Sequence, residues 1–130
     1  LTHDQVNLIM SDGTDKLHYL DTVTLEVAKS IKVTDENGPV KNLNELEYIE
    51  GFIFANVWQT NTILKIDPAT GKVVGKLDLS KLASDARKAS PRVDVLNGIA
   101  WHPETRSFLV TGKNWPNIYI LKLDESKPHG

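Results

Sequence analysis

The chain has 130 residues, of which 40% are hydrophobic and 25% charged, a composition typical of one globular domain and unlike that of a disordered or fibrous chain. Its 15 basic and 17 acidic residues give a net charge of −2, which removes the bulk electrostatic argument for a nucleic-acid or membrane partner. It has no cysteine, which excludes disulfides, thiolate metal sites and a cysteine nucleophile, and no apolar run approaches a membrane span in length.

Short apolar runs that alternate with polar residues predict a mostly β chain, and its strands fall into three groups. The first group, over residues 8–33, contains three strands. The second group, over residues 43–79, contains four. A hairpin turn is predicted at 67–71, because Pro68 presets the first turn dihedral and Gly71 supplies a positive φ.

A short peripheral helix is predicted after the second group, from Ser80 to Lys88. Ser80 is the expected N-cap, and Pro91 is expected to end the helix. The third group of strands, over residues 96–123, contains three strands, with a second turn of the same kind at 102–106.

The chain repeats itself, since six apolar and turn residues recur 46 positions further on. The first set is Leu17, Leu20, Asp21, Thr24, Val27 and Ile31, and the second is Ile63, Ile66, Asp67, Thr70, Val73 and Leu77. A second echo, with an offset of 53, pairs residues 43–46 with 96–99. Units of four short strands that recur every 40 to 55 or so residues are typical of β-propeller blades.

We therefore predict an all-β fold of the β-propeller class, with one partial propeller domain over residues 1–130 and blade-like units at about 6–33, 43–79 and 96–123. Ten strands make about two and a half blades, and a propeller needs about four or more to close its ring. Both ends should present uncovered edges and faces. We expect the remaining half of the propeller or a second copy of the chain to cover them. The first residue, Leu1, suggests a processed chain or a piece of a longer one.

Alignment of the three blades places Asp12, Trp58 and Lys113 at one equivalent position, at the end of the second strand of each blade. Equivalent positions in successive blades come together around the propeller axis. An acid, an aromatic ring and a cation then converge at one channel mouth, which is typical of a small-ligand site. The alternative is that all three are simply solvated residues at loop ends.

Asn44 and Asn97 hold matched positions on the predicted innermost strands. Strict alternation places Asn44 on the same face as Leu46 and on the face opposite Glu45. A side-chain cap on a loop carbonyl explains an asparagine near a turn equally well, and this interpretation is favoured for Asn97, which precedes a glycine.

Three other kinds of site find no support in the sequence. Gly112-Lys113 lacks the glycines and the hydroxyl of a phosphate-binding loop. The four histidines have no partners at zinc-ligand spacing, and no G-x-S-x-G elbow presents a nucleophilic serine. We therefore expect no metal and no cofactor.

Three segments, taken together, resemble the plant and bacterial type of glutamine cyclotransferase. They are Leu43-Asn44-Glu45-Leu46-Glu47-Tyr48 running into Ala55-Asn56-Val57-Trp58-Gln59-Thr60, then Asp94-Val95-Leu96-Asn97-Gly98-Ile99-Ala100, then Val110-Thr111-Gly112-Lys113-Asn114-Trp115-Pro116. A fourth segment, Ile9-Met10-Ser11-Asp12-Gly13, is also similar to the family. The resemblance covers nearly the whole chain, but only the C-terminal half of a family member.

This resemblance implies a five-bladed propeller that works without zinc. Its substrate would be a peptide or protein with an N-terminal glutamine, which it converts to pyroglutamate with release of ammonia. The resemblance carries over Asn44 and Trp58 as substrate-binding residues and Lys113 as a catalytic residue. It places the family's essential glutamate in the half that is absent here, so we expect an incomplete active site. It also favours a secreted or periplasmic location.

The residue types suit this chemistry. A neutral α-amine must attack the γ-amide of its own side chain, so catalysis needs mostly positioning and proton transfer. Trp58 would form one wall of the substrate site and exclude water. Asn44 would hydrogen-bond the amide or the backbone of the substrate. Lys113 would stabilise charge on the carbonyl oxygen or pair with the missing glutamate.

Two other functions compete with this hypothesis. The first is a non-catalytic propeller fragment that binds peptides or a partner chain, because a fold does not imply a function. The second is a lactonase-like propeller that binds a divalent cation through groups such as Asp12 and Asn97. A cation is disfavoured there by Lys113 and Trp58 at the same rim.

Overall fold

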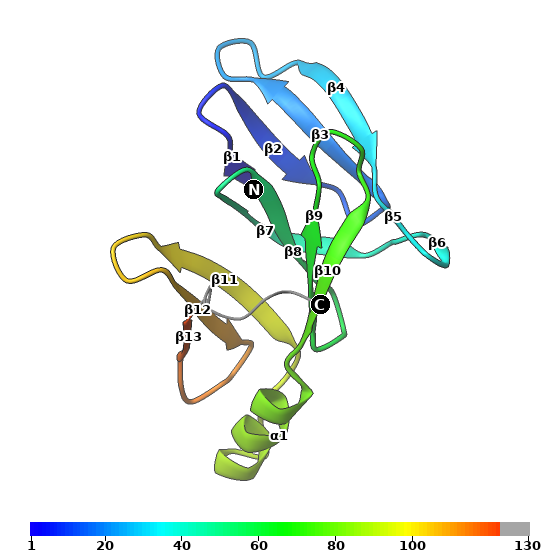
Figure 1. The fold of residues 1–130 in the computed structure, drawn as a ribbon. Coiled ribbons are helices and arrows are strands. Elements are labelled where there is room, and N and C mark those ends of the chain that lie inside the picture. Colours follow the sequence, from blue (N-terminus) through cyan, green and yellow to red (C-terminus); the bar gives the residue numbers. More distant parts are fainter. Residues whose placement is uncertain (123–130) are drawn as a thin grey trace.

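The computed structural model describes residues 1–122, which form three antiparallel sheets, a two-stranded ribbon and one helix (Figure 1). Strands dominate the described residues, so the all-β prediction is confirmed, and the successive sheets are arranged as neighbouring blades of a partial β-propeller. The third unit expected from the sequence ends at position 123, which lies outside the described residues.

The first sheet contains four strands in the order β1-β2-β3-β4. They are β1 (Thr2–His3), β2 (Asn7–Ser11), β3 (Lys16–Asp21) and β4 (Val27–Lys32). The sequence predicted the last three and missed β1. A strand of two residues is too short to show alternation, so β1 is defined only by its pairing with β2, in which Thr2 lies opposite Ile9.

The second sheet also contains four strands, in the order β10-β9-β8-β7, and follows the ribbon of β5 (Thr34–Asp35) and β6 (Gly38–Pro39). Its strands are β7 (Leu43–Ile49), β8 (Phe52–Val57), β9 (Thr62–Ile66) and β10 (Val73–Asp78). The turn predicted at 67–71 joins β9 to β10, as expected.

The third sheet has the order β11-β12-β13 and follows helix α1 (Ser80–Ala89). Its strands are β11 (Leu96–His102), β12 (Ser107–Gly112) and β13 (Tyr119–Lys122), and the turn predicted at 102–106 joins the first two. Within the described part of the chain, no helix is long and apolar enough to cross a membrane.

Helix α1 begins and ends close to the predicted positions, but its predicted cap is wrong. Leu79 holds the N-cap position and makes no side-chain cap, while the Ser80 hydroxyl donates to the carboxylate of Asp78. The same carboxylate oxygen accepts from the Ser80 amide at 2.9 Å, so Asp78 holds Ser80 inside the first turn of the helix. Ser90 is extended, as expected for a residue that precedes proline.

The second sheet is packed on both faces, because its inner strand β7 contacts both β1 and β11. The first core contains Ile9, Leu17, Tyr19, Val33, Leu43, Leu46, Ile53, Ala55, Leu64 and Ile66, and the second contains Ile49, Ile63, Leu79, Leu96, Ile99, Phe108 and Val110. Alternation along β8 sends Ile53 into the first core and its neighbour Phe54 against the second.

The 46-residue repeat is reproduced by the hydrogen bonds of two turns. The Leu25 amide donates to the Asp21 carbonyl at 2.9 Å, and the Gly71 amide donates to the Asp67 carbonyl at 2.8 Å. Leu25 has φ 61° and Gly71 has φ 76°. Only the second position requires glycine for space, because a Cβ on Gly71 would clash with the carbonyl oxygen of Lys32.

Candidate functional site

The three residues that the blade alignment placed at one rim do hold equivalent positions. Asp12 directly follows β2, Trp58 directly follows β8, and Lys113 directly follows β12. These strands are the second of their sheets, counted from the inner strand. The positions are equivalent because each blade repeats the same order of strands, so the second strand of each blade ends at the same rim.

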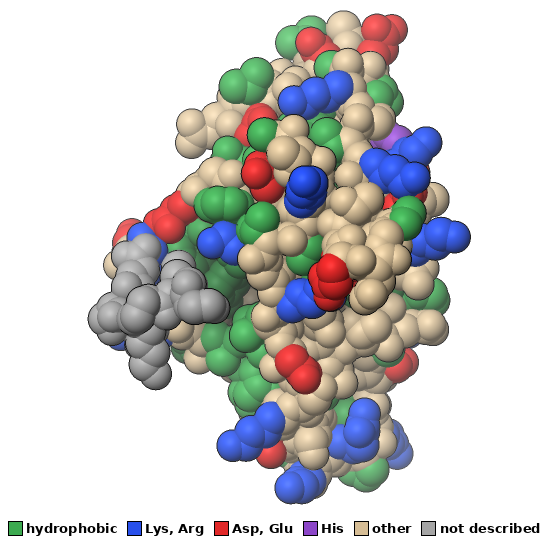
Figure 2. Space-filling view, turned by 45° about the vertical axis from the view of Figure 1, so that its right-hand side comes forward, with side chains coloured by type: hydrophobic (Ala, Val, Ile, Leu, Met, Phe, Trp, Pro, Cys, Tyr) green, Lys and Arg blue, Asp and Glu red, His purple; other side chains and the backbone are tan. Residues whose placement is uncertain are grey.

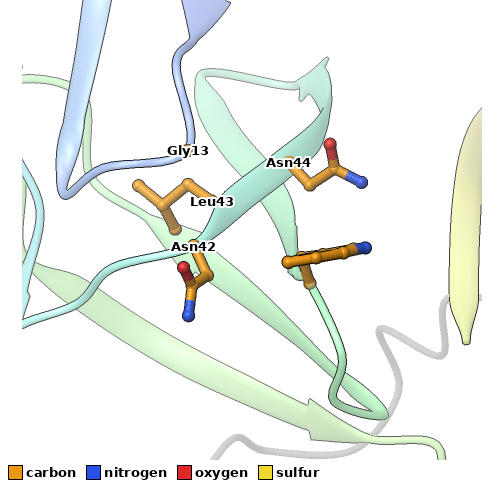
Figure 3. A pocket seen from close by; sticks show the side chains of 5 residues that line it. Gly13, Asn42, Leu43 and Asn44 are labelled. Carbon is orange, nitrogen blue, oxygen red and sulfur yellow. The ribbon is translucent and has the colours of Figure 1, made fainter.

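Trp58 and Asn44 line one pocket of about 220 Å³, together with Gly13, Asn42 and Leu43 (Figure 3). Two backbone hydrogen bonds hold its wall. The Asn42 amide donates to the Gly13 carbonyl at 3.2 Å, and the Trp58 amide donates to the Asn42 carbonyl at 2.8 Å. The turn after β2, the start of β7 and the end of β8 are thereby joined around the pocket. The Trp58 side chain is 47% exposed, so it faces an open site rather than a closed core.

Asn44 is oriented by a β-bulge that breaks strict alternation. Leu43 pairs with Val57 and Leu46 pairs with Ala55, so β7 carries one more residue than β8 between these pairs. The prediction that Asn44 shares the face of Leu46 is therefore wrong, since Leu46 is in the first core while the Asn44 amide points towards the third sheet (Figure 3).

An equivalent bulge on β11 contains Asn97. Leu96 pairs with Gly112 and Ile99 pairs with Val110, which again leaves one extra residue on the inner strand. Asn44 Nδ2 donates to Asn97 Oδ1 at 3.1 Å. The two asparagines at matched positions thus bind each other across neighbouring blades.

The backbone of Asn44 is held from the other side as well. The Ser11 hydroxyl, at the end of β2, donates to the Asn44 carbonyl at 2.6 Å. One residue of the inner strand of the second sheet is therefore hydrogen-bonded to both neighbouring sheets. Its side chain is positioned before any ligand binds.

Asn56 was not predicted from the sequence as a site residue, and it is fully buried at 0% exposure. Its Oδ1 accepts from the Glu45 amide at 3.0 Å, within the bulge, and its Nδ2 donates to the Leu96 carbonyl at 3.0 Å. Asn56 thus satisfies the backbone groups that the bulges leave unpaired. A polar residue inside the apolar strand β8 was the signal that could have identified it.

Lys113 lies at the same rim but does not line the pocket with Asn44 and Trp58. Its amide donates to the Val95 carbonyl at 2.9 Å, and its carbonyl accepts from the Asp94 amide at 2.8 Å. Its side chain is exposed, and within residues 1–122 its ammonium makes no ion pair. The structure brings Asn44 and Trp58 together and leaves Lys113 on the neighbouring blade.

Asp12 is engaged in local contacts at the third rim position. It accepts hydrogen bonds from the Thr14 hydroxyl and from the Thr14 amide, the latter at 3.0 Å, and its Oδ2 lies 2.8 Å from His18 Nε2. His18 Nδ1 in turn lies 2.7 Å from Ser30 Oγ. The hydrogen bond from Thr14 and then that from His18 lower the pKa of Asp12 to about 2. An acid held so firmly in its ionised form suits shaping the Gly13 turn better than exchanging protons.

No carboxylate of the described residues lines the pocket. Burial raises the pKa of Glu47, on β7, above its ordinary value, but this residue is not part of the pocket wall. Among residues 1–122, no group of three His, Asp or Glu side chains is arranged to hold a metal ion. Asp12 and Asn97, considered as cation ligands, contact different partners.

Comparison with known proteins gives one consistent family. The family described as glutamine cyclotransferase matches residues 1–123. A glutaminyl-peptide cyclotransferase of Arabidopsis thaliana is 42% identical over 127 residues, which is 97% of this chain and 40% of that protein. The crystal structure of Myxococcus xanthus glutaminyl cyclase superposes with a TM-score of 0.80 at 35% identity, over 92% of this chain and 53% of that chain. The chain thus spans about half the length, or less, of these relatives.

Proposed function

The chain belongs to the glutamine cyclotransferase family, and from this premise we propose that it supplies part of the active site of a glutaminyl-peptide cyclotransferase. The observation that carries the proposal is the pocket between blades in which an exposed indole, Trp58, lies beside a pre-oriented amide, Asn44. A small, partly apolar pocket with a few fixed polar groups suits the side chain of one amino acid.

The reaction closes a five-membered ring within the substrate. The α-amine nitrogen of an N-terminal glutamine attacks the carbon of its own γ-amide, forming a new C–N bond. The bond from that carbon to the amide nitrogen breaks, and the proton lost by the amine leaves with the nitrogen as ammonia. Because both reacting groups belong to one residue, the enzyme has to fold the side chain back and move one proton.

Asn44 has one acceptor to offer the substrate. Its Nδ2 is bound to Asn97, whereas its Oδ1 accepts no hydrogen bond from the described residues. The Oδ1 atom can accept from the substrate's amine or amide N–H and so hold the glutamine in a folded conformation. Trp58 would cover the apolar part of that side chain and limit the access of water.

Lys113 would stabilise negative charge on the γ-carbonyl oxygen as the amine attacks. It lies on the next blade, so its exposed side chain would have to reach across the rim to the folded glutamine. Its exposed ammonium is equally able to pair with a carboxylate brought by the rest of the propeller.

The acid/base group that transfers the proton has to come from outside the described residues. No carboxylate of residues 1–122 lines the pocket, and the chain spans 40% of one relative and 53% of the other. We propose that the remaining half of the propeller, or a second copy of this chain, completes the ring and supplies that carboxylate.

Ammonia release from a peptide with a free N-terminal glutamine tests the function, measured on the product of the complete reading frame that contains this chain. The same peptide with an acetylated amine is the matched control, because its nitrogen cannot act as the nucleophile. Ammonia from the free peptide only, with the matching loss of mass, supports the proposal. Binding of the free peptide without ammonia release would favour a non-catalytic peptide-binding propeller.

A further inference from the structure

Residues 79–95, named the insertion, connect β10 to β11, and both ends of this segment are bound at the rim that carries Trp58 and Lys113. The Leu79 amide donates to the Asn61 carbonyl at 2.7 Å, which fixes the start of the insertion to the turn that follows Trp58. At its other end, Asp94 and Val95 are hydrogen-bonded to the backbone of Lys113. The insertion therefore connects the two blade ends that carry Trp58 and Lys113.

The insertion is basic although the chain as a whole is acidic. It contains four basic and two acidic residues, whereas the chain has 15 basic and 17 acidic residues. The basic residues are Lys81, Arg87, Lys88 and Arg92, and all four are exposed. Lys and Arg side chains gather at the lower end of the molecule in Figure 2, which is the end where α1 lies in Figure 1.

Stabilisation of the helix accounts for only two of these four basic residues. Arg87 and Lys88 are in the last turn of α1, where cations interact favourably with the helix dipole. Lys81 is in the first turn, where a cation is unfavourable and where no acidic residue is present, and Arg92 lies beyond the helix. None of the four forms an ion pair within residues 1–122.

We propose that this insertion is a specificity subsite, which selects peptide substrates that carry Asp or Glu at the positions following the N-terminal glutamine. The proposal rests on the proposed function, because it assumes that the glutamine occupies the pocket at Trp58. From there the peptide has to leave across the rim, and the insertion begins beside the turn after Trp58 and ends beside Lys113. Exposed cations beside that path attract an acidic segment and repel a basic one.

The test compares three glutamine peptides that differ only at the second to fourth positions, which are Asp/Glu, Ala/Ser or Lys. On the product of the complete reading frame, we expect kcat/KM for the acidic peptide to exceed that for the lysine peptide by about tenfold or more at low salt. The ratio should fall towards one in about 0.5 M NaCl, since exposed charges are screened. If kcat/KM is the same for the acidic and the lysine peptide at low salt, the proposal is overturned.

The variant Lys88→Glu/Arg92→Glu should abolish or reverse the preference. The matched control, Lys29→Glu/Lys72→Glu, makes the same change in charge on exposed residues of β4 and of the turn between β9 and β10, and should keep it. A ratio taken within one variant does not depend on how much of the protein is folded. If the insertion variant keeps the same ratio of kcat/KM between the acidic and the lysine peptide, the insertion does not select the substrate and the proposal is overturned.

Binding separates this inference from the proposed function. If no peptide is turned over, the proposed function fails, and the affinity of a labelled acidic peptide for the same proteins still tests the subsite. Tighter binding of the acidic peptide than of the lysine peptide, lost in the insertion variant and retained in the control, would support the subsite. Equal binding of the two peptides would overturn it.

Discussion

Asn44 donates a side-chain hydrogen bond to Asn97 at 3.1 Å, and each residue lies in a bulge at the same position of its own inner strand. The two asparagines therefore hold equivalent positions in neighbouring blades and contact each other. Asn97 has no place in the pocket wall, and we consider it a positioning residue for Asn44.

Asn97→Ala should lower kcat/KM for a glutamine peptide by roughly tenfold, because Asn44 loses the acceptor that orients it. The free energy of unfolding should fall by only about 1 kcal/mol, the usual net value of one hydrogen bond. Steady-state kinetics and urea denaturation measure the two effects. Asn97→Asp keeps an oxygen acceptor and should recover most of the activity. A variant Asn97→Ala with normal kinetics would contradict the positioning role.

Lys113→Ala should reduce kcat by about two to three orders of magnitude, as expected when a group that stabilises developing charge is removed. Its side chain is exposed and the backbone makes its structural contacts, so the melting temperature should stay nearly unchanged. Single-turnover ammonia release separates this chemical step from binding. Lys72→Ala, which removes an exposed lysine from a turn between strands, serves as the control. Equal kcat in the two variants would remove Lys113 from the mechanism.

Asn56→Ala should destabilise the protein by about 2 to 3 kcal/mol, because it leaves the Glu45 amide and the Leu96 carbonyl without their partner. Chemical denaturation of the variant gives this value directly. Asn37→Ala changes the same residue type at an exposed position and should have little effect. A loss below about 0.5 kcal/mol would mean that other groups satisfy the two bulges.

Asp12 should contribute to a pH-dependent part of the stability. Its pKa is lowered from 3.8 to about 2 by Thr14 and then His18, so its contribution is complete above its unfolded-state pKa near 4. The contribution is lost as the pH falls towards 2. Asp12→Asn keeps an oxygen acceptor for the Thr14 amide but removes the charge. Melting temperatures should therefore differ between wild type and variant at pH 6 and converge near pH 2. A constant difference across this range would contradict the assignment.

Gly71→Ala should destabilise the protein more than Gly51→Ala. Both glycines have a positive φ, but a Cβ on Gly71 would meet the Lys32 carbonyl, whereas none of the described atoms lies within 4 Å of a Cβ on Gly51. Strain alone costs about 1 to 2 kcal/mol, so Gly51→Ala should lose about that amount and Gly71→Ala clearly more. Urea midpoints compare the two. Similar losses would show that the turn can move away from Lys32.

Most of the strands, the turns at 67–71 and 102–106 and the rim positions could be predicted from the sequence because each is encoded locally. Alternation with period two marks the strands of a half-buried sheet, and Asp67, Pro68 and Gly71 specify a turn by their own backbone preferences. The same turn residues recur 46 positions further on, and the turn of the next blade forms the same hydrogen bond, from Leu25 in the first blade and from Gly71 in the second. The 46-residue period also relates Asp12 to Trp58, whereas Lys113 was aligned with them because it too follows the second strand of its blade.

The orientation of the side chains inside the site depends on hydrogen bonds between residues that lie 33 to 53 positions apart in the sequence. A bulge changes the face of Asn44 without changing the composition of its strand, and the partners of Asn56 lie on two other strands. The separation of Lys113 from the pocket depends on how two blades are set against each other. Such geometry depends on which backbone groups remain unpaired once the sheets pack, and only the tertiary structure determines this because those groups belong to different blades.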